Sequence, residues 1–243
     1  MWIWCGFVYK YCFNKNLIMI ILNGINSEIA KKILPYFLKN NKVIGIYSTK
    51  YTGPKNKNLV LFKKNKINFK KLELLSKKNK KICFLNFAAK RDENLLINIK
   101  KNEMKNIFQS NLSEPITLLK EIIPHMIKNK FGRIIFISSS TAENGYPGNI
   151  AYSATKSALT GLSGTISKEY KNFNITCNII SLGYFETKMW KSLSSFKRAT
   201  LLKNTLSQKL CNPLSVYELI KLIIKFNEIN LSKIYLDGGN LFR

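Results

Sequence analysis

The segment GRIIFISSSTAENGYPGNIAYSATKSALTGLSGTISKEYKNFNITCNIISLG, at residues 132–183, decides the fold of this chain. Its first part, residues 132–138, is an almost continuous apolar run, which is typical of a strand buried on both faces. A long helix is expected over residues 150–170, and a second buried strand over residues 175–181. A strand, a helix and a strand in this order predict two parallel strands joined by a crossover helix.

The same alternation of strands and helices continues on both sides of this segment. Strands are expected at residues 17–22, 43–47, 59–62, 82–87 and 234–236, and helices at 26–38, 69–75, 99–110, 114–129 and 215–226. The pattern predicts a single α/β domain of Rossmann type over residues 17–243, a doubly wound parallel sheet of about seven strands with helices on both faces. Residues 1–16 are expected to form an N-terminal extension.

The composition excludes several kinds of site. The five cysteines are scattered and never form a CxxC pair, which indicates a reducing, cytoplasmic compartment and argues against zinc. The single histidine, His125, excludes a site built from several histidines, so no metal is expected. No apolar segment is long enough and free enough of charge to predict a membrane span.

The formal net charge is +27, but its distribution does not indicate a nucleic-acid partner. The lysines are spread along the whole chain, without a basic arm or a basic stripe that contains aromatic residues. The charge does predict a general attraction for acidic partners, including an acidic carrier protein.

Tyr152, Lys156 and Ser139 are the candidate residues for proton transfer. Five of the eleven tyrosines have a lysine four residues further along the chain, so only the context distinguishes Tyr152. A phenol has a pKa near 10. An ammonium one helical turn along, and the positive end of the expected helix, would both favour the phenolate. Tyr152 could then act as general acid or base beside the Ser139 hydroxyl.

Other informative residues are expected at the same edge of the sheet. In an open parallel sheet, ligands bind beyond the carboxyl ends of the strands. Gly24 follows the first expected strand, Asn86 lies in the fourth, Ser139 follows the fifth and Gly183 follows the sixth. The sequence therefore predicts one site at this edge.

Six segments in order resemble the short-chain dehydrogenase/reductase family, most closely its 3-oxoacyl-carrier-protein reductases. They are LNFAAKRDENLL at 85–96, QSNLSEP at 109–115, GRIIFISSS at 132–140, AYSATKSALTGL at 151–162, NIISLGYFETKM at 178–189 and YLDGGN at 235–240. The resemblance covers residue 81 to the C-terminus and implies an NAD(P)-dependent oxidoreductase. Such an enzyme reduces a carbonyl or oxidises an alcohol by hydride transfer, with Tyr152 as proton donor or acceptor.

The resemblance also implies roles for individual residues. Lys156 would hold the nicotinamide ribose, and Asn111 would support a water relay to this lysine. Ser139 would donate to the substrate oxygen as charge develops on it. Phe185 and Thr187 would approach the nicotinamide carboxamide and the phosphates.

The segment 188–212 resembles the mobile lid that covers the substrate in this family. Met189 and Trp190 are candidates for apolar contacts with the substrate, although a surface helical loop would have the same composition. The resemblance further implies a homotetramer or dimer, formed through the helices at 114–129 and 150–170.

The glycine-rich turn departs from the family pattern. Family members place three glycines between the first strand and its helix, whereas LNGINSEIA at 22–30 contains only Gly24 and is about four residues short. Gly24 and Ile25 are the residues of this turn that we expect against the cofactor. Asn26 or Ser27 can cap the helix and leave amides free for a phosphate.

The segments after the third and fourth strands also differ. Family members commonly have a pair of acidic residues after the third strand. This chain has Phe62, Lys63 and Lys64 there instead. Asn86 and Ala88 match the family's Asn-Asn-Ala-Gly, and we expect both to bind the cofactor.

The end of the second expected strand favours NADP over NAD. An acidic residue there would bind the ribose hydroxyls of NAD. This chain has Ser48, Thr49 and Lys50, which suit a 2′-phosphate, and Ser48 is the candidate contact.

Three functional hypotheses remain open at this point. The first is an enzyme like the 3-oxoacyl-carrier-protein reductases, acting on a small carbonyl or alcohol that can be bound to a carrier protein. The second keeps the chemistry but changes the substrate to a sugar or to a precursor of a polysaccharide or secondary metabolite. The third, based on the short glycine turn, is a cofactor-poor protein of this fold that binds a partner or a metabolite without turnover. Residues near the expected pocket (Glu143, Asn144, Tyr146 and Trp190) do not decide between the two enzymes.

Overall fold

A computed structural model describes residues 18–240, and the expected extension at 1–16 lies outside this range. Within it, seven strands form one parallel sheet in the order β3-β2-β1-β4-β5-β6-β7. The strands are β1 (Ile18–Asn23), β2 (Lys42–Tyr47), β3 (Leu59–Lys63), β4 (Lys81–Asn86), β5 (Gly132–Ser139), β6 (Ile175–Leu182) and β7 (Lys233–Leu236). The predicted doubly wound sheet is confirmed.

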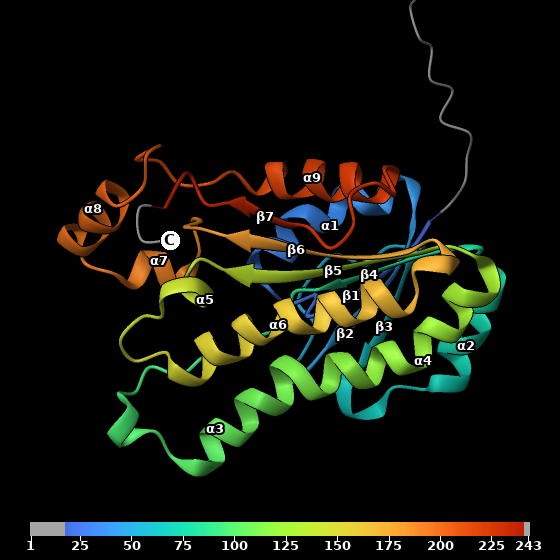
Figure 1. Ribbon diagram of the computed structural model, residues 1–243, viewed down its shortest axis with the longest axis horizontal. Helices are drawn as coiled ribbons and strands as arrows, with labels where there is room; N and C mark the ends of the chain where they lie inside the picture. The colour runs from blue at the N-terminus through green and yellow to red at the C-terminus, as the bar shows by residue number, and fades with distance from the viewer. Residues whose placement is uncertain (1–17, 241–243) are drawn as a thin grey trace, which may run out of the picture.

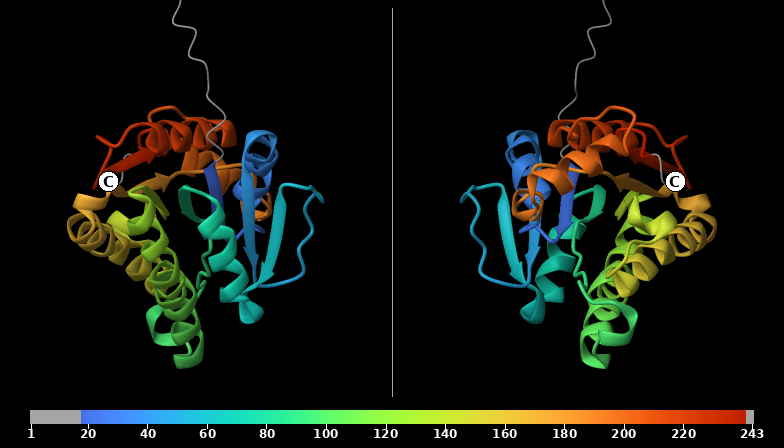
Figure 2. Two further views of the ribbon diagram at one scale, coloured as in Figure 1. Left: turned by 90° about the vertical axis from the view of Figure 1, so that its right-hand side faces the viewer. Right: turned by 90° about the vertical axis from the view of Figure 1, so that its left-hand side faces the viewer.

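Helices cover both faces of this sheet, as Figure 2 shows. Side chains from α2 (Phe69–Lys78), α4 (Glu114–Asn129) and α6 (Ile150–Glu169) pack on one face. Side chains from α1 (Glu28–Asn40) and α9 (Pro213–Lys225) pack on the other. The remaining helices are α3 (Lys101–Phe108), α5 (Thr141–Asn144), α7 (Lys188–Ser192) and α8 (Ser195–Lys203), with short 3-10 turns at Lys64–Lys66, Leu96–Asn98 and Lys171–Phe173.

Strand β1 shows why the sequence forms a two-sided core. Met19 and Ile21 lie in the cluster on one face, and Ile20 and Leu22 lie in the cluster on the other. Successive side chains of a strand point to opposite faces, so an unbroken apolar run supplies both layers.

The two helices predicted at 99–110 and 114–129 do not separate. A π-helical turn, η3 (Gln109–Ser113), joins α3 to α4, so the helical path is continuous. The turn buries the side chain of Asn111, which bonds outside its own helix. A polar side chain used in this way is typical of π turns at functional sites.

The strand order reverses between β1 and β4, which neighbour each other in the centre of the sheet (Figure 1). Ligands of doubly wound folds bind at this reversal, beyond the carboxyl ends of the strands. The predicted site residues Gly24, Asn86 and Ser139 all lie at this edge of the sheet.

No helix among residues 18–240 has the length and apolar character needed to cross a membrane. The same residues hold no group of three or more His, Cys, Asp or Glu side chains placed to bind a metal ion.

Candidate active site

Strand β5 and helix α6 bring Ser139 and Tyr152 together. Ser139 is the last residue of β5, and Tyr152 lies in the first turn of α6. The two side chains are hydrogen-bonded to each other. Both residues are half-buried.

Burial raises the pKa of Tyr152, while its hydrogen bond with Ser139 and the charge of Arg91 act in the opposite direction. The expectation that Lys156 acidifies the phenol stays a prediction. Lys156 Nζ lies 5.6 Å from the Tyr152 ring centroid and donates a 2.6 Å hydrogen bond to the carbonyl of Ile137.

Lys156 is 3% exposed, and burial lowers its pKa to about 8. An ammonium loses hydration when it is buried, and one carbonyl acceptor replaces only part of that hydration. Lys156 therefore lies beneath the phenol as a cation that is easily deprotonated.

Asp92 holds the amino end of α6. Its carboxylate accepts hydrogen bonds from the amides of Ala151 and Tyr152 at 3.0 and 3.1 Å, and its side chain is fully buried. A carboxylate at this end neutralises the positive end of the helix dipole. The helix terminus therefore favours the Tyr152 phenolate less than the sequence predicts.

Arg91, next to Asp92, lies over the phenol. Its guanidinium carbon is 5.4 Å from the Tyr152 ring centroid. Nε and Nη2 both donate to Oδ1 of the buried Asn149, at 3.0 and 2.7 Å, and Nη1 contacts the sulfur of Met189. Arg91, Asp92 and Asn149 are not predictable as site residues from the sequence, because their contacts lie about 60 residues apart along the chain.

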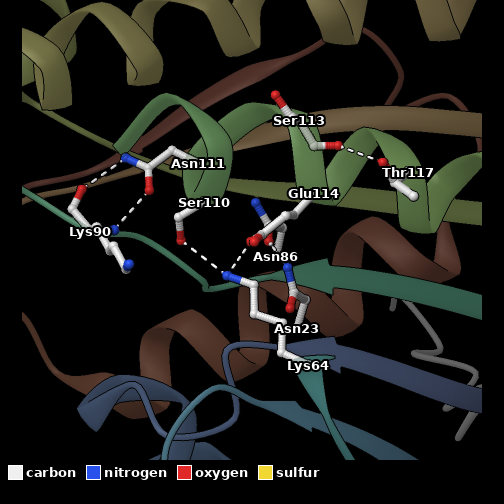
Figure 3. Close-up of polar contacts among 9 residues, drawn as sticks. All are labelled: Asn23, Lys64, Asn86, Lys90, Ser110, Asn111, Ser113, Glu114 and Thr117. Carbon is white, nitrogen blue, oxygen red and sulfur yellow. Dashed lines mark hydrogen bonds and ion pairs between the residues drawn. The ribbon is translucent and has the colours of Figure 1, made fainter. Parts of the chain in front are cut away.

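Asn111 fixes the loop after β4 to helix α6, as Figure 3 shows in part. Its side chain donates to the carbonyl of Lys90 at 2.8 Å and to Thr155 Oγ1 at 2.9 Å, and it accepts from the amide of Lys90 at 2.7 Å. Thr155 lies one residue before Lys156. Asn111 therefore contacts the residue that precedes the lysine.

A polar cluster lies at the carboxyl ends of β1, β3 and β4 (Figure 3). Asn23 donates to Asn86 Oδ1 at 2.8 Å, while the buried Nδ2 of Asn86 has no hydrogen-bond partner among residues 18–240. Lys64 lies where family members commonly have an acidic residue. It forms an ion pair with Glu114 at the start of α4 and donates to Ser110 at 3.3 Å. The ion pair neutralises much of the charge that Lys64 brings to this edge.

Backbone hydrogen bonds and close packing hold the shortened turn after β1. The amides of Gly24 and Ile25 both donate to the carbonyl of Ile46, at 3.0 and 3.1 Å. Gly24 has φ +82, and a Cβ there would lie 2.4 Å from the nitrogen of Ala88. Ile25 is buried against Gly45. Both amides are therefore hydrogen-bonded within the turn, and a contact of Gly24 and Ile25 with the cofactor stays a prediction.

The amino end of α1 keeps its free amides. Ser27 makes no side-chain cap, so the amides of the first helical turn lack intrahelical acceptors. The Asn26 amide group instead donates to Thr49 and to the carbonyl of Lys50 beyond β2, at 3.3 and 3.2 Å. Ser48 is exposed at the same strand end. This region can meet an anionic ligand.

The segment after β6 closes over the same edge. Phe185 is buried, and Thr187 caps α7 by accepting from the amide of Trp190 at 3.2 Å. Two contacts tie the segment to α1: the Glu28 carboxylate accepts from the amide of Lys188 at 2.8 Å, and Lys32 donates to the carbonyl of Glu186 at 2.9 Å.

The predicted lid at 188–212 contains α7 and α8. Trp190 is buried and packs against Tyr184, with ring centroids 5.7 Å apart, whereas Met189 is 47% exposed and faces Arg91. Of the two candidates, Met189 is the exposed one, and its contact with a substrate stays a prediction. Glu143 forms an ion pair with Lys233.

The carboxyl edge of the sheet fits a dinucleotide. It offers an uncapped helix end, a buried amide nitrogen of Asn86 without a partner, and a lysine beneath a Ser–Tyr pair. Helix termini bind phosphates, and buried polar groups without partners are costly unless a ligand satisfies them. The fold and this edge define a dinucleotide-dependent α/β oxidoreductase.

Comparisons with known proteins agree with this class. The profile of the short chain dehydrogenase family matches residues 67–198. The chain is 36% identical over 192 residues to a 3-oxoacyl-[acyl-carrier-protein] reductase of Buchnera aphidicola, covering 74% of this chain and 77% of that protein. It is 34% identical over 194 residues to the reductase of the same name from Haemophilus influenzae, covering 74% and 78%.

Solved structures show the same fold. The structure titled "ElxO with NADP Bound" is similar with a TM-score of 0.81 at 22% identity, covering 93% of this chain and all of that chain. A 4-hydroxyisoleucine dehydrogenase complexed with NADH gives a TM-score of 0.75 at 24% identity, covering 91% and 97%. The chain belongs to the short-chain dehydrogenase/reductase family, whose members are NAD(P)-dependent oxidoreductases.

Proposed function

We propose that this protein is an NADP-dependent carbonyl reductase whose substrate is a 3-oxoacyl thioester on a carrier protein. The observation that carries the proposal is the hydrogen-bonded Ser139–Tyr152 pair above the buried Lys156. The names of the relatives from Buchnera and Haemophilus support the choice of substrate. In the opposite direction, the same groups would oxidise a secondary alcohol.

A bound nicotinamide cofactor supplies the hydride that reduces the carbonyl carbon. Ser139 donates a hydrogen bond to the substrate oxygen, where negative charge develops. Tyr152 transfers its phenolic proton to this oxygen, which completes the alcohol and leaves a phenolate. Lys156 stabilises that phenolate and holds the nicotinamide ribose. Asn111 orders a water relay that returns a proton to Lys156, supported by its position beside Thr155.

The other predicted residues would hold the dinucleotide along the edge of the sheet. Gly24 and Ile25 shape the turn beneath it, and the free amides of α1 meet the phosphates. Asn86, with its unsatisfied amide nitrogen, and the backbone of Ala88 meet the adenosine half. Phe185 and Thr187 meet the nicotinamide and phosphates, and Ser48 meets the 2′-phosphate that distinguishes NADP from NAD. The exposed position of Ser48, with no acidic residue beside it, supports NADP.

The net charge supports the proposed partner, and the cysteines support the proposed compartment. A net charge of +27 favours an acidic carrier protein as the source of the substrate. Scattered cysteines, two of them fully buried, favour a cytoplasmic protein. A homotetramer or dimer through α4 and α6 and a single domain over residues 17–243 belong to the same proposal.

A binding titration followed by a substrate panel tests the proposal. NADPH and NADH are titrated separately into the protein, with nicotinamide fluorescence as the signal. We expect micromolar binding of NADPH and weaker binding of NADH. Turnover is then compared between a 3-oxoacyl thioester and carbonyl-containing sugars. Failure of both cofactors to bind at millimolar concentration would favour the non-catalytic hypothesis, and faster sugar turnover would favour the second enzyme.

A further inference from the structure

We propose that Arg91 selects 3-oxoacyl thioesters as substrates by donating a hydrogen bond to the thioester carbonyl oxygen. The inference rests on the proposed reductase function and adds a specificity residue to it. A 3-oxoacyl thioester has two carbonyl groups that are separated by one carbon atom. If the Ser139–Tyr152 pair binds the ketone oxygen that is reduced, a donor beside this pair can bind the thioester oxygen.

Arg91 is the accessible cation beside the catalytic tyrosine. Its guanidinium carbon lies 5.4 Å from the Tyr152 ring centroid, and Lys156 Nζ lies 5.6 Å from the same centroid. The two cations differ in access, because Lys156 is 3% exposed whereas Arg91 is an exposed residue. Arg91 is therefore the cation that a substrate can reach from solvent, and Lys156 keeps its proposed role toward the phenol and the ribose.

A buried amide holds the guanidinium in place. Nε and Nη2 of Arg91 both donate to Asn149 Oδ1, at 3.0 and 2.7 Å, and Asn149 is 3% exposed. Asn149 directly precedes the first residue of α6, the helix that carries Tyr152. The guanidinium is thus placed relative to the tyrosine before a substrate binds, which reduces the side-chain entropy lost when it bonds to a ligand.

Arg91 keeps hydrogen-bond donors for a ligand. A guanidinium has five N–H groups. Two of them donate to Asn149 and one contacts the sulfur of Met189, so two remain without an acceptor among residues 18–240. Within the same residues Arg91 forms no ion pair with a carboxylate, and the neighbouring Asp92 carboxylate is taken by the amides of α6. A charged donor of this kind bonds a carbonyl oxygen about twice as strongly as a neutral one.

The contact with Met189 places these donors beside the predicted lid. Met189 is the second residue of α7 and is 47% exposed. The guanidinium therefore lies between the start of α6 and the segment 188–212. A thioester is polar at its carbonyl oxygen and apolar at its sulfur and acyl chain. A cation next to a flexible thioether side chain matches both parts.

A 3-oxo acid with a free carboxylate is the alternative ligand for these donors. Its two oxygens could bind the same N–H groups of Arg91, and the charge would attract it to the same place. The proposed function favours the thioester, because the substrate is then delivered on a carrier protein. The experiment distinguishes the two by comparing them directly.

Three ketones and three variants test the role. The ketones have equal chain length: a 3-oxoacyl thioester, the 3-oxo acid, and a thioether in which a methylene group replaces the thioester carbonyl. Arg91→Met removes the charge and keeps much of the side-chain length, whereas Arg91→Lys keeps the charge but loses the planar fork. Lys101→Met, at the exposed start of α3, is the matched control that removes a positive charge elsewhere.

The wild-type protein should have a kcat/KM for the thioester that is about 10–100-fold higher than for the thioether, because one hydrogen bond from a charged donor has about this effect. Arg91→Met should lower this ratio by about the same factor, mainly through KM, and Arg91→Lys should lower it less. Lys101→Met should keep the ratio within about twofold. A general disturbance of α6 would instead lower kcat for both compounds and leave the ratio unchanged.

Calorimetry measures the same preference without turnover. The 3-hydroxyacyl thioester and its thioether analogue are titrated into the protein with NADP⁺ present. A ratio that Arg91→Met leaves unchanged in both measurements would overturn the inference while the reductase assignment stands. A wild-type preference for the 3-oxo acid over the thioester would overturn it as well. If Arg91→Met removes the preference in calorimetry but the wild-type protein reduces none of the ketones, the contact stands and the reductase assignment fails.

Discussion

The buried carboxylate of Asp92 is expected to make one of the largest single contributions of any active-site side chain to the unfolding free energy. It accepts from the amides of Ala151 and Tyr152 at 3.0 and 3.1 Å, and its side chain is 0% exposed. In Asp92→Ala both amides would lose their acceptor inside the protein. A hydrogen bond to a charged group contributes about 1.5–3 kcal/mol, so the loss should be about 3 kcal/mol of unfolding free energy.

Asp92→Asn separates charge from hydrogen bonding at the same position. The amide oxygen can accept from one of the two N–H groups, while its NH₂ group faces the other. We therefore expect a loss of about 1.5 kcal/mol, half of that in Asp92→Ala. Glu93→Gln is the matched control, because Glu93 is the exposed neighbour, and surface changes of this kind stay within about 0.5 kcal/mol.

Urea unfolding at a fixed protein concentration measures these differences. Asp92→Ala should lower the midpoint and leave the m-value unchanged, because the folded surface is the same. In thermal unfolding the same loss corresponds to a fall of roughly 6–12 °C for a chain of this length. A loss below about 1 kcal/mol in Asp92→Ala would show that the carboxylate does not hold α6, and the argument from its two hydrogen bonds would be wrong.

Three other changes test separate parts of the account. Gly24→Ala should destabilise the protein by about 2 kcal/mol or more and weaken NADPH binding, because φ is +82 and the new Cβ would collide with the backbone of Ala88. Gly161→Ala, in open space on α6, should instead stabilise the protein by about 0.5–1 kcal/mol. Equal urea midpoints for the two variants would contradict this. Lys156→Met should abolish turnover but stabilise the fold at pH 7 by up to about 3 kcal/mol, because burial lowers the lysine pKa from 10.5 to about 8. The unfolding free energy of the wild-type protein should rise between pH 8 and 10.5, where the unfolded chain binds more protons than the folded one, and that of the variant should not. A wild-type unfolding free energy that stays constant over this range would contradict the lowered pKa of Lys156. Ser48→Asp should shift the ratio of NADPH to NADH affinity toward NADH at least tenfold in fluorescence titrations, and an unchanged ratio would remove Ser48 from the cofactor site.

The layered fold could be predicted from the sequence because burial on both faces leaves a direct mark on it. Residues 18–22 of β1 and 82–85 of β4 are unbroken apolar runs, and each strand lies between two parallel neighbours. The π turn at Gln109–Ser113 could not be predicted in the same way. It depends on a bond from Asn111 to the backbone of Lys90, 21 residues away, and local spacing carries no signal of that contact.

The candidate site was predictable where residue type and spacing carry the chemistry. Ser139 and Tyr152 are brought together as expected, and Lys156 lies beneath them. The electrostatics were not predictable, because they depend on which acceptor each charge meets. Lys156 donates to a backbone carbonyl, and Asp92 accepts from the amides of α6. Arg91 lies over the aromatic ring of Tyr152.

The central claim is that the Tyr152 hydroxyl is the proton donor of a dinucleotide-dependent reductase, and removing this one oxygen tests it most directly. Turnover and NADPH affinity are measured side by side for the wild-type protein and Tyr152→Phe. General acid catalysis contributes about 10²–10⁴-fold, so turnover should fall by that factor while the NADPH dissociation constant stays within about twofold. A variant that keeps more than about a tenth of the wild-type rate would contradict the claim.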